Sequence, residues 1–145
     1  SSLGPTFDGR IKPDVMGPGF KIISALSGES THSKSCGVTE MQGTSMAAPL
    51  VAGLSVLARD YFMKVWPNVC TSGYMYCRGF YPSGFLLKAV IIHSGRPVQQ
   101  YSDSVFDGKT YIASHSLGQP PDNFQGYGQI TLNSVLPLKK KSNYN

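Results

Sequence analysis

The chain has 145 residues, of which 41% are hydrophobic and 14% charged, and its formal net charge is +5. The low charged fraction, together with 16 glycines and 10 prolines, indicates a loop-rich globular protein of the secreted type rather than a disordered one. The length suits a single domain, and no apolar run approaches the roughly 20 residues of a membrane span. Three of the positive charges lie in the run 139–141, which favours a solvated tail over a nucleic-acid-binding patch.

Turn-forming residues dominate the first part of the chain, where Gly-Pro, Asp-Gly and Pro-Gly pairs follow one another. Two short stretches, at 14–16 and 21–25, are predicted to be strands. Residues 27–37 are rich in Ser, Gly, Thr and Lys, and this composition predicts a surface loop.

The strongest secondary-structure signal is a helix from residue 45 to about residue 65, because apolar residues recur there with the helical period. Pro49 falls in or near the first turn, where a missing N–H costs little, and Trp66-Pro67 predicts the end of the helix. Small residues near the start allow close packing against neighbouring backbone: Ala47, Ala48, Ala52 and Gly53.

A second helix is predicted over residues 83–94, with Ser83 as its N-cap and Gly95 as its C-terminal stop. Its residues are mostly apolar, so we expect it to be largely buried. Residues 96–123 are polar and are predicted to be irregular. A Gly-Tyr-Gly turn then leads into a last predicted strand at 129–132.

The three cysteines do not form a complete set of pairs. Cys70 and Cys77 lie in one loop rich in Gly and Tyr, close enough in sequence for a local disulfide. Cys36 is left over, and it is either a buried thiol or bonded to a partner outside this chain. The histidines do not bracket the cysteines at the spacing of zinc ligands, so no metal site is predicted.

The segment 43–49, Gly-Thr-Ser-Met-Ala-Ala-Pro, places one serine at the start of the long helix. Backbone N–H groups at a helix start have no intrahelical partner, so a hydroxyl there stands beside possible oxyanion donors. Gly43 permits close backbone approach and a positive φ. The residues alone leave two interpretations open: Ser45 is a nucleophile, or Thr44 or Ser45 caps a buried helix.

The chain resembles the subtilisin-like serine proteases, or subtilases, over residues 1 to about 137. Three blocks carry the resemblance in the family's order: SSLGPT, DGRIKPDV and GPG in residues 1–19; GTSMAAP with VAG in residues 43–53; and PS, LLKA, GYG and a leucine in residues 82–132. The pattern is similar to that of the bacterial oxidatively stable alkaline subtilases and their protist relatives. One departure is Gly17, where the family usually has alanine.

By that resemblance Ser45 is the nucleophile of an Asp–His–Ser triad and its backbone N–H is an oxyanion donor, with Gly43 and Thr44 at the rim of the oxyanion and substrate pocket. The family's Asp, His and side-chain oxyanion Asn lie well upstream of the serine, and none can be assigned here. His32 lies in a loop where the family keeps no triad member. His93 is expected to be packed or hydrogen-bonded within the second helix.

The resemblance also implies the fold. We expect the C-terminal part of a three-layer α/β subtilase domain, in which the three predicted strands join a parallel sheet and the two helices flank it. Residues 1–137 would form this portion, and residues 138–145 a basic tail or the start of a following domain. The simplest interpretation is a fragment of a longer protease, whose upstream half supplies the missing triad residues and the rest of the sheet.

The implied function is a secreted serine endopeptidase that cleaves proteins or peptides through an acyl-enzyme on Ser45, with no cofactor and no nucleic-acid partner. Calcium sites are frequent in the family, but no ligand for one can be placed here. Met46 follows the nucleophile directly, so its oxidation is expected to inactivate the enzyme. The alternative is a non-catalytic subtilase-like module that binds peptides or proteins; the presence of both an Asp and a His block upstream would exclude it.

Overall fold

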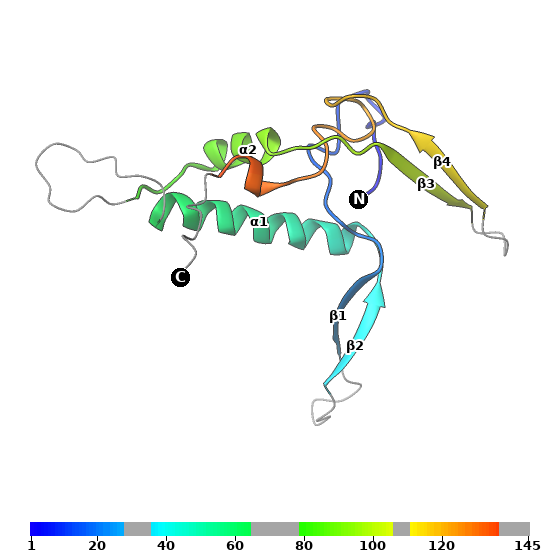
Figure 1. The fold of residues 1–145 in the computed structure, drawn as a ribbon, viewed down its shortest axis with the longest axis horizontal. Helices are drawn as coiled ribbons and strands as arrows, with labels where there is room; N and C mark the ends of the chain where they lie inside the picture. Colours follow the sequence, from blue (N-terminus) through cyan, green and yellow to red (C-terminus); the bar gives the residue numbers. More distant parts are fainter. Residues whose placement is uncertain (28–35, 65–78, 106–110, 137–145) are drawn as a thin grey trace, which may run out of the picture.

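The computed structural model describes residues 1–27, 36–64, 79–105 and 111–136. Figure 1 shows two helices that lie along each other and two hairpins that extend from them in different directions. The elements, in chain order, are β1 (Ile22–Leu26), β2 (Gly37–Met41), α1 (Thr44–Lys64), α2 (Gly84–His93), β3 (Gln100–Val105), β4 (Tyr111–Ser116) and the 3-10 helix η1 (Leu132–Ser134).

Both predicted helices are confirmed. Helix α1 begins one residue before the predicted start, and its predicted end at Trp66-Pro67 lies outside the described residues. Helix α2 begins after Ser83, whose hydroxyl accepts a hydrogen bond from the N–H of Leu86 at 3.2 Å, as an N-cap does. The expectation that α2 is largely buried is wrong, because Ile91 is its one buried residue and Phe85 is 90% exposed.

The hydrophobic core lies between the second half of α1 and the end of the described chain. Ala58, Tyr61, Phe62 and Leu136 are its buried members. The partly buried residues that pack against them come from α2 and the segment around η1: Leu87, Val90, Leu132 and Val135. The core is therefore small, and it lies toward the C-terminal half of α1 rather than at its start.

The predicted strand at 21–25 is confirmed as β1, one residue later, but its partner differs from the expected one. It pairs in antiparallel register with β2, so that Ile22 lies opposite Met41 and Leu26 opposite Gly37. The segment after Gly37 therefore returns beside β1 and leads directly into α1. A parallel neighbour had been expected at this place.

The interpretation of residues 96–123 as irregular is wrong, because β3 and β4 form an antiparallel hairpin there. The Tyr101 ring stacks on the His115 ring across the two strands, with centroids 4.8 Å apart. Such cross-strand pairs stabilise hairpins, whereas the prediction rested on the mainly polar composition of the segment.

The strands predicted at 14–16 and 129–132 are also wrong in their extent. Gln129 forms single bridges, one parallel to Met16 and one antiparallel to Arg96, and η1 begins only three residues later. Glycines allow these segments to approach, since a Cβ on Gly128 would lie 2.2 Å from the Arg96 carbonyl oxygen. Within the described ranges, the bridge between Met16 and Gln129 is the one parallel pairing, so the predicted parallel sheet is not seen there.

Candidate active site

Ser45 lies in the first turn of α1 and is exposed. The residue before the helix is Gly43, which has a φ of 142° and whose carbonyl accepts hydrogen bonds from the N–H groups of Met46 and Ala47 at 3.1 and 3.4 Å. Gly43 therefore occupies the cap position, and the interpretation of Thr44 or Ser45 as a helix cap is wrong. The backbone N–H of Ser45 is one of the first four of the helix, which have no intrahelical acceptor.

The turn that carries Ser45, residues 43–47, is called the serine turn below. It is held by a segment far from it in sequence. The N–H of Gly43 donates to the carbonyl of Gly19 at 2.7 Å. Gly17 is fixed in turn by Ser1, whose hydroxyl accepts from the Gly17 N–H at 2.9 Å and donates to its carbonyl at 3.0 Å. The Gly-Pro-Gly sequence at 17–19 predicts a turn, but nothing in its composition shows that it supports the serine.

A hollow of about 510 Å³ opens beside this turn. Its walls are mainly apolar, and they come from the first residues of the chain and from one side of α1: Ser1, Ser2, Leu3, Gly4, Pro5, Thr6, Lys12, Pro13, Val15, Thr44, Ala47, Ala48 and Val51. Thr44 thus belongs both to the serine turn and to the wall of the hollow.

None of the described histidines forms a hydrogen bond with Ser45. Within the described ranges, no hydrogen bond reaches the Ser45 hydroxyl. His93 is exposed at the last turn of α2 beside a separate hollow, so the expectation that it is packed is wrong. His115 stacks on Tyr101 in the β3–β4 hairpin. His32 lies outside the described residues.

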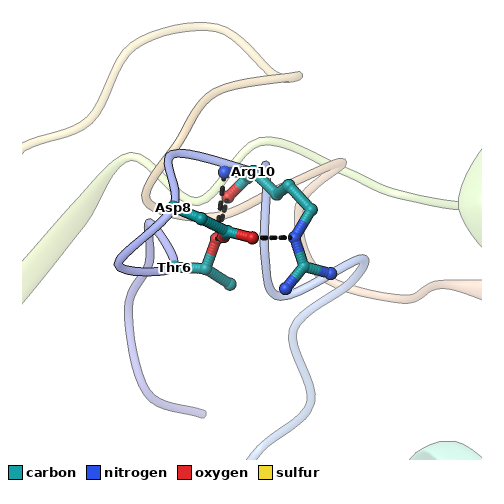
Figure 2. Close-up of polar contacts among 3 residues, drawn as sticks. All are labelled: Thr6, Asp8 and Arg10. Atoms are coloured by element: carbon teal, nitrogen blue, oxygen red, sulfur yellow. Dashed lines mark hydrogen bonds and ion pairs between the residues drawn. The ribbon is translucent and has the colours of Figure 1, made fainter.

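The carboxylates near the start of the chain are engaged in structural contacts. Figure 2 shows the turn in which Asp8 accepts hydrogen bonds from the Thr6 hydroxyl and from the Arg10 guanidinium, the latter at 2.8 Å. These two bonds lower the pKa of Asp8, the Thr6 bond most. The hydrogen bond from Lys12 to Asp14 likewise lowers the pKa of Asp14, and Lys88 adds a weaker attraction. Both carboxylates are therefore charged groups that are paired with neighbouring cations.

The described residues hold no cluster of three or more His, Cys, Asp or Glu side chains that could bind a metal ion. No helix in the part of the chain that the structure describes is long and apolar enough to cross a bilayer. Cys36 is exposed with a free thiol, so the buried-thiol interpretation of it is wrong. The predicted Cys70–Cys77 pair lies outside the described residues.

Comparison with known proteins gives one family match. The model of the subtilase family matches residues 1–128. The serine protease/ABC transporter B family proteins tagB and tagD of Dictyostelium discoideum are 30% and 35% identical over 98% and 94% of this chain. The C5a peptidase of Streptococcus pyogenes is 38% identical over 50% of it.

The relatives are much longer than this chain. It spans 8% of the length of tagB and of tagD and 6% of that of the C5a peptidase. No solved structure matches the chain. The similarity therefore concerns one region of each relative, and the range matched by the family model, residues 1–128, contains Ser45.

Proposed function

The chain belongs to the subtilase family, and on this basis we propose that Ser45 is the nucleophile of a serine endopeptidase. The observation that carries the proposal is the exposed Ser45 in the first turn of α1, two residues after the positive-φ Gly43. The hydroxyl attacks the peptide carbonyl, its proton passes through a base to the leaving amine, and water then hydrolyses the acyl-enzyme. The substrates are proteins or peptides.

The backbone N–H of Ser45 serves as an oxyanion donor in this proposal. Donors at a helix start are fixed before the reaction, so they stabilise the charge of the tetrahedral intermediate without reorganisation. Gly43 and Thr44 then form the rim of this site, since they flank the serine and Thr44 lines the adjoining hollow. Removal of one such donor typically lowers kcat by a factor of about 100 to 1,000.

The base and its orienting carboxylate come, in our proposal, from a part of the protease domain outside residues 1–145. Support for this comes from Asp8 and Asp14, which are paired with cations, and from the described histidines, none of which hydrogen-bonds Ser45. The same outside part would supply the side-chain oxyanion donor. It would also supply the strands that complete a three-layer α/β domain, to which residues 1–137 contribute the C-terminal portion.

Two further properties belong to the proposal and rest on family membership alone. The protein acts outside the cell or in the secretory pathway, in keeping with its low charged fraction. Calcium binding by the complete protease also belongs to the proposal; the described residues hold no cluster of three or more His, Cys, Asp or Glu side chains, and no calcium ligand is assigned among them.

A second candidate function is a non-catalytic module that binds peptides or proteins. One observation favours it: within the described ranges, no imidazole hydrogen-bonds the Ser45 hydroxyl. A serine hydroxyl without such a base is a weak nucleophile. The two candidates differ in whether Ser45 reacts covalently, and this difference can be measured directly.

The test is to treat the natural protein that contains this chain with a fluorophosphonate probe and to locate the adduct by mass spectrometry. We expect the label on Ser45 and its loss in Ser45→Ala. Ser55→Ala is the matched control on the same helix, because its hydroxyl donates to the Val51 carbonyl, and it should label at the parental rate. A folded parent that takes no label on Ser45 would sink the catalytic proposal and favour the binding module.

A further inference from the structure

Residues 17–19, Gly-Pro-Gly, pack against the serine turn although they take no part in the proposed chemistry. Gly17 and Gly19 are both buried, whereas their neighbours Pro18 and Phe20 are exposed. The connection to the serine turn is made by backbone atoms, since the Gly43 N–H donates to the Gly19 carbonyl at 2.7 Å. Its geometry therefore depends on how closely two pieces of main chain can approach.

An added side chain would not fit at Gly19. A Cβ there would lie 2.7 Å from the carbonyl oxygen of Gly43 and 3.2 Å from the Cβ of Ala47. The same Gly43 oxygen accepts the first hydrogen bonds of α1, from Met46 and Ala47. A displacement of Gly43 would therefore move the first turn of the helix, and Ser45 lies within that turn.

We infer that residues 17–19 are a positioning segment for Ser45, and that Gly19 is its critical residue. The inference rests on the proposed function of Ser45. The segment holds the serine turn from the side of Gly43, so it fixes the direction of the Ser45 hydroxyl and of its backbone N–H. A misplacement of about 1 Å is enough to cost about 100-fold in rate.

The other end of the segment is anchored where the backbone around Met16, Arg96 and Gln129 meets. Met16 donates its N–H to the Gly128 carbonyl at 2.8 Å and accepts from the Ile130 N–H at 3.1 Å. Ser1 holds Gly17 through three hydrogen bonds between 2.9 and 3.1 Å. Residues 16–19 thus connect the serine turn to the bridges that Gln129 forms with Met16 and Arg96.

Gly17 makes a second close approach, to the side of α1. A Cβ at this position would lie 2.9 Å from Cγ2 of Val51 and 3.1 Å from the carbonyl oxygen of Ala47. The nearer atom belongs to a side chain that can be shortened, whereas the atom nearest to Gly19 belongs to the backbone. The two glycines should therefore differ in whether a second substitution can relieve the strain.

The first experiment compares Gly19→Ala with Gly53→Ala in the natural protein. A Cβ on Gly53 meets no atom within 4 Å, so this variant is the matched control on α1. For Gly19→Ala we expect kcat and the fluorophosphonate labelling rate to fall about 100-fold while KM stays within a few-fold. Gly53→Ala should keep the parental values.

The second experiment is a double-mutant cycle between Gly17→Ala and Val51→Ala, which decides the inference if Gly19→Ala does not fold. Gly17→Ala should slow labelling several-fold in the parental background and have a smaller effect in the Val51→Ala background, where only the contact with the Ala47 carbonyl oxygen remains close. A role in stability alone would instead lower the melting temperature and leave the labelling rate of the folded variant unchanged.

The outcomes separate the two proposals. If the parent is not labelled, the proposed function fails and the inference falls with it. If the parent is labelled but folded Gly19→Ala reacts at the parental rate, the inference alone is wrong. If Gly19→Ala does not fold, the labelling rate of Gly17→Ala decides. An unchanged rate overturns the inference, and so does a reduced rate that Val51→Ala does not raise again.

Discussion

Met46 is a residue of the serine turn whose side chain can be oxidised. It follows Ser45 in the first turn of α1, it is half-buried, and its N–H donates to Gly43. Peroxide converts a thioether into a polar sulfoxide, which here would stand beside the proposed reacting hydroxyl. We therefore expect peroxide to inactivate the natural protein and Met46→Ala to resist this inactivation.

The control for this prediction is Met63→Leu, since Met63 is also half-buried and lies at the other end of the same helix. Residual labelling of Ser45 by the fluorophosphonate after peroxide treatment is the measurement. Met63→Leu should remain as sensitive as the parent. Equal sensitivity of Met46→Ala and the parent would show that another group is the target.

At the scale of the elements, helix α2 depends on a single capping side chain. Ser83 accepts the hydrogen bond of the Leu86 N–H, and no acidic residue in the first turn of α2 supplements it. Loss of an N-cap serine typically costs about 1 kcal/mol. Ser83→Ala should therefore lower the free energy of unfolding of the natural protein by about that amount, measured by urea denaturation.

Ser83→Asp is the matched variant for this prediction, because aspartate caps helices as well as serine does. It should keep the parental unfolding free energy. An equal loss in Ser83→Asp and Ser83→Ala would mean that Ser83 acts through its packing and not through its oxygen. The fluorophosphonate labelling rate should change in neither folded variant, since α2 carries no residue of the proposed site.

Among the described residues, the β1–β2 hairpin has few contacts that stabilise it apart from the pairing of its two strands. An isolated two-stranded hairpin is marginally stable in water, and both faces of β1–β2 carry exposed apolar side chains, among them Ile23, Leu26, Val38 and Met41. Its position is nevertheless fixed at one end, because β2 runs into the serine turn and the segment before β1 is held by Gly43. The contacts of residues 17–19 thus fix the base of the hairpin.

At the scale of the whole molecule, few apolar side chains are buried among the residues that the structure describes. They are Ala47, Ala58, Tyr61, Phe62, Ile91, Ile130 and Leu136. Exposed side chains include Phe20, Val56, Leu57 and Phe85, three of them on the two helices. An isolated chain needs buried apolar surface to offset the conformational entropy lost on folding.

Residues 1–145 expressed alone are therefore expected to aggregate or to remain molten. Differential scanning calorimetry and an amide NMR spectrum provide the measurement. A sharp cooperative transition with dispersed amide signals would contradict this expectation. The same experiment on the natural protein should show such a transition if other parts of it cover the exposed faces of α1 and α2.

The sequence by itself determined the two helices, the cap at Ser83, the freedom of Gly43 to adopt a positive φ and the position of Ser45 at a helix start. These features depend on local periodicity, capping chemistry and glycine conformation, which operate within a few residues. The tertiary structure decided the β3–β4 hairpin, the single bridges at Gln129 and the support of Gly43 by Gly19. Each of these is a backbone pairing between separate segments, and backbone groups have the same chemistry at every residue, so no pattern of side chains announces their partners.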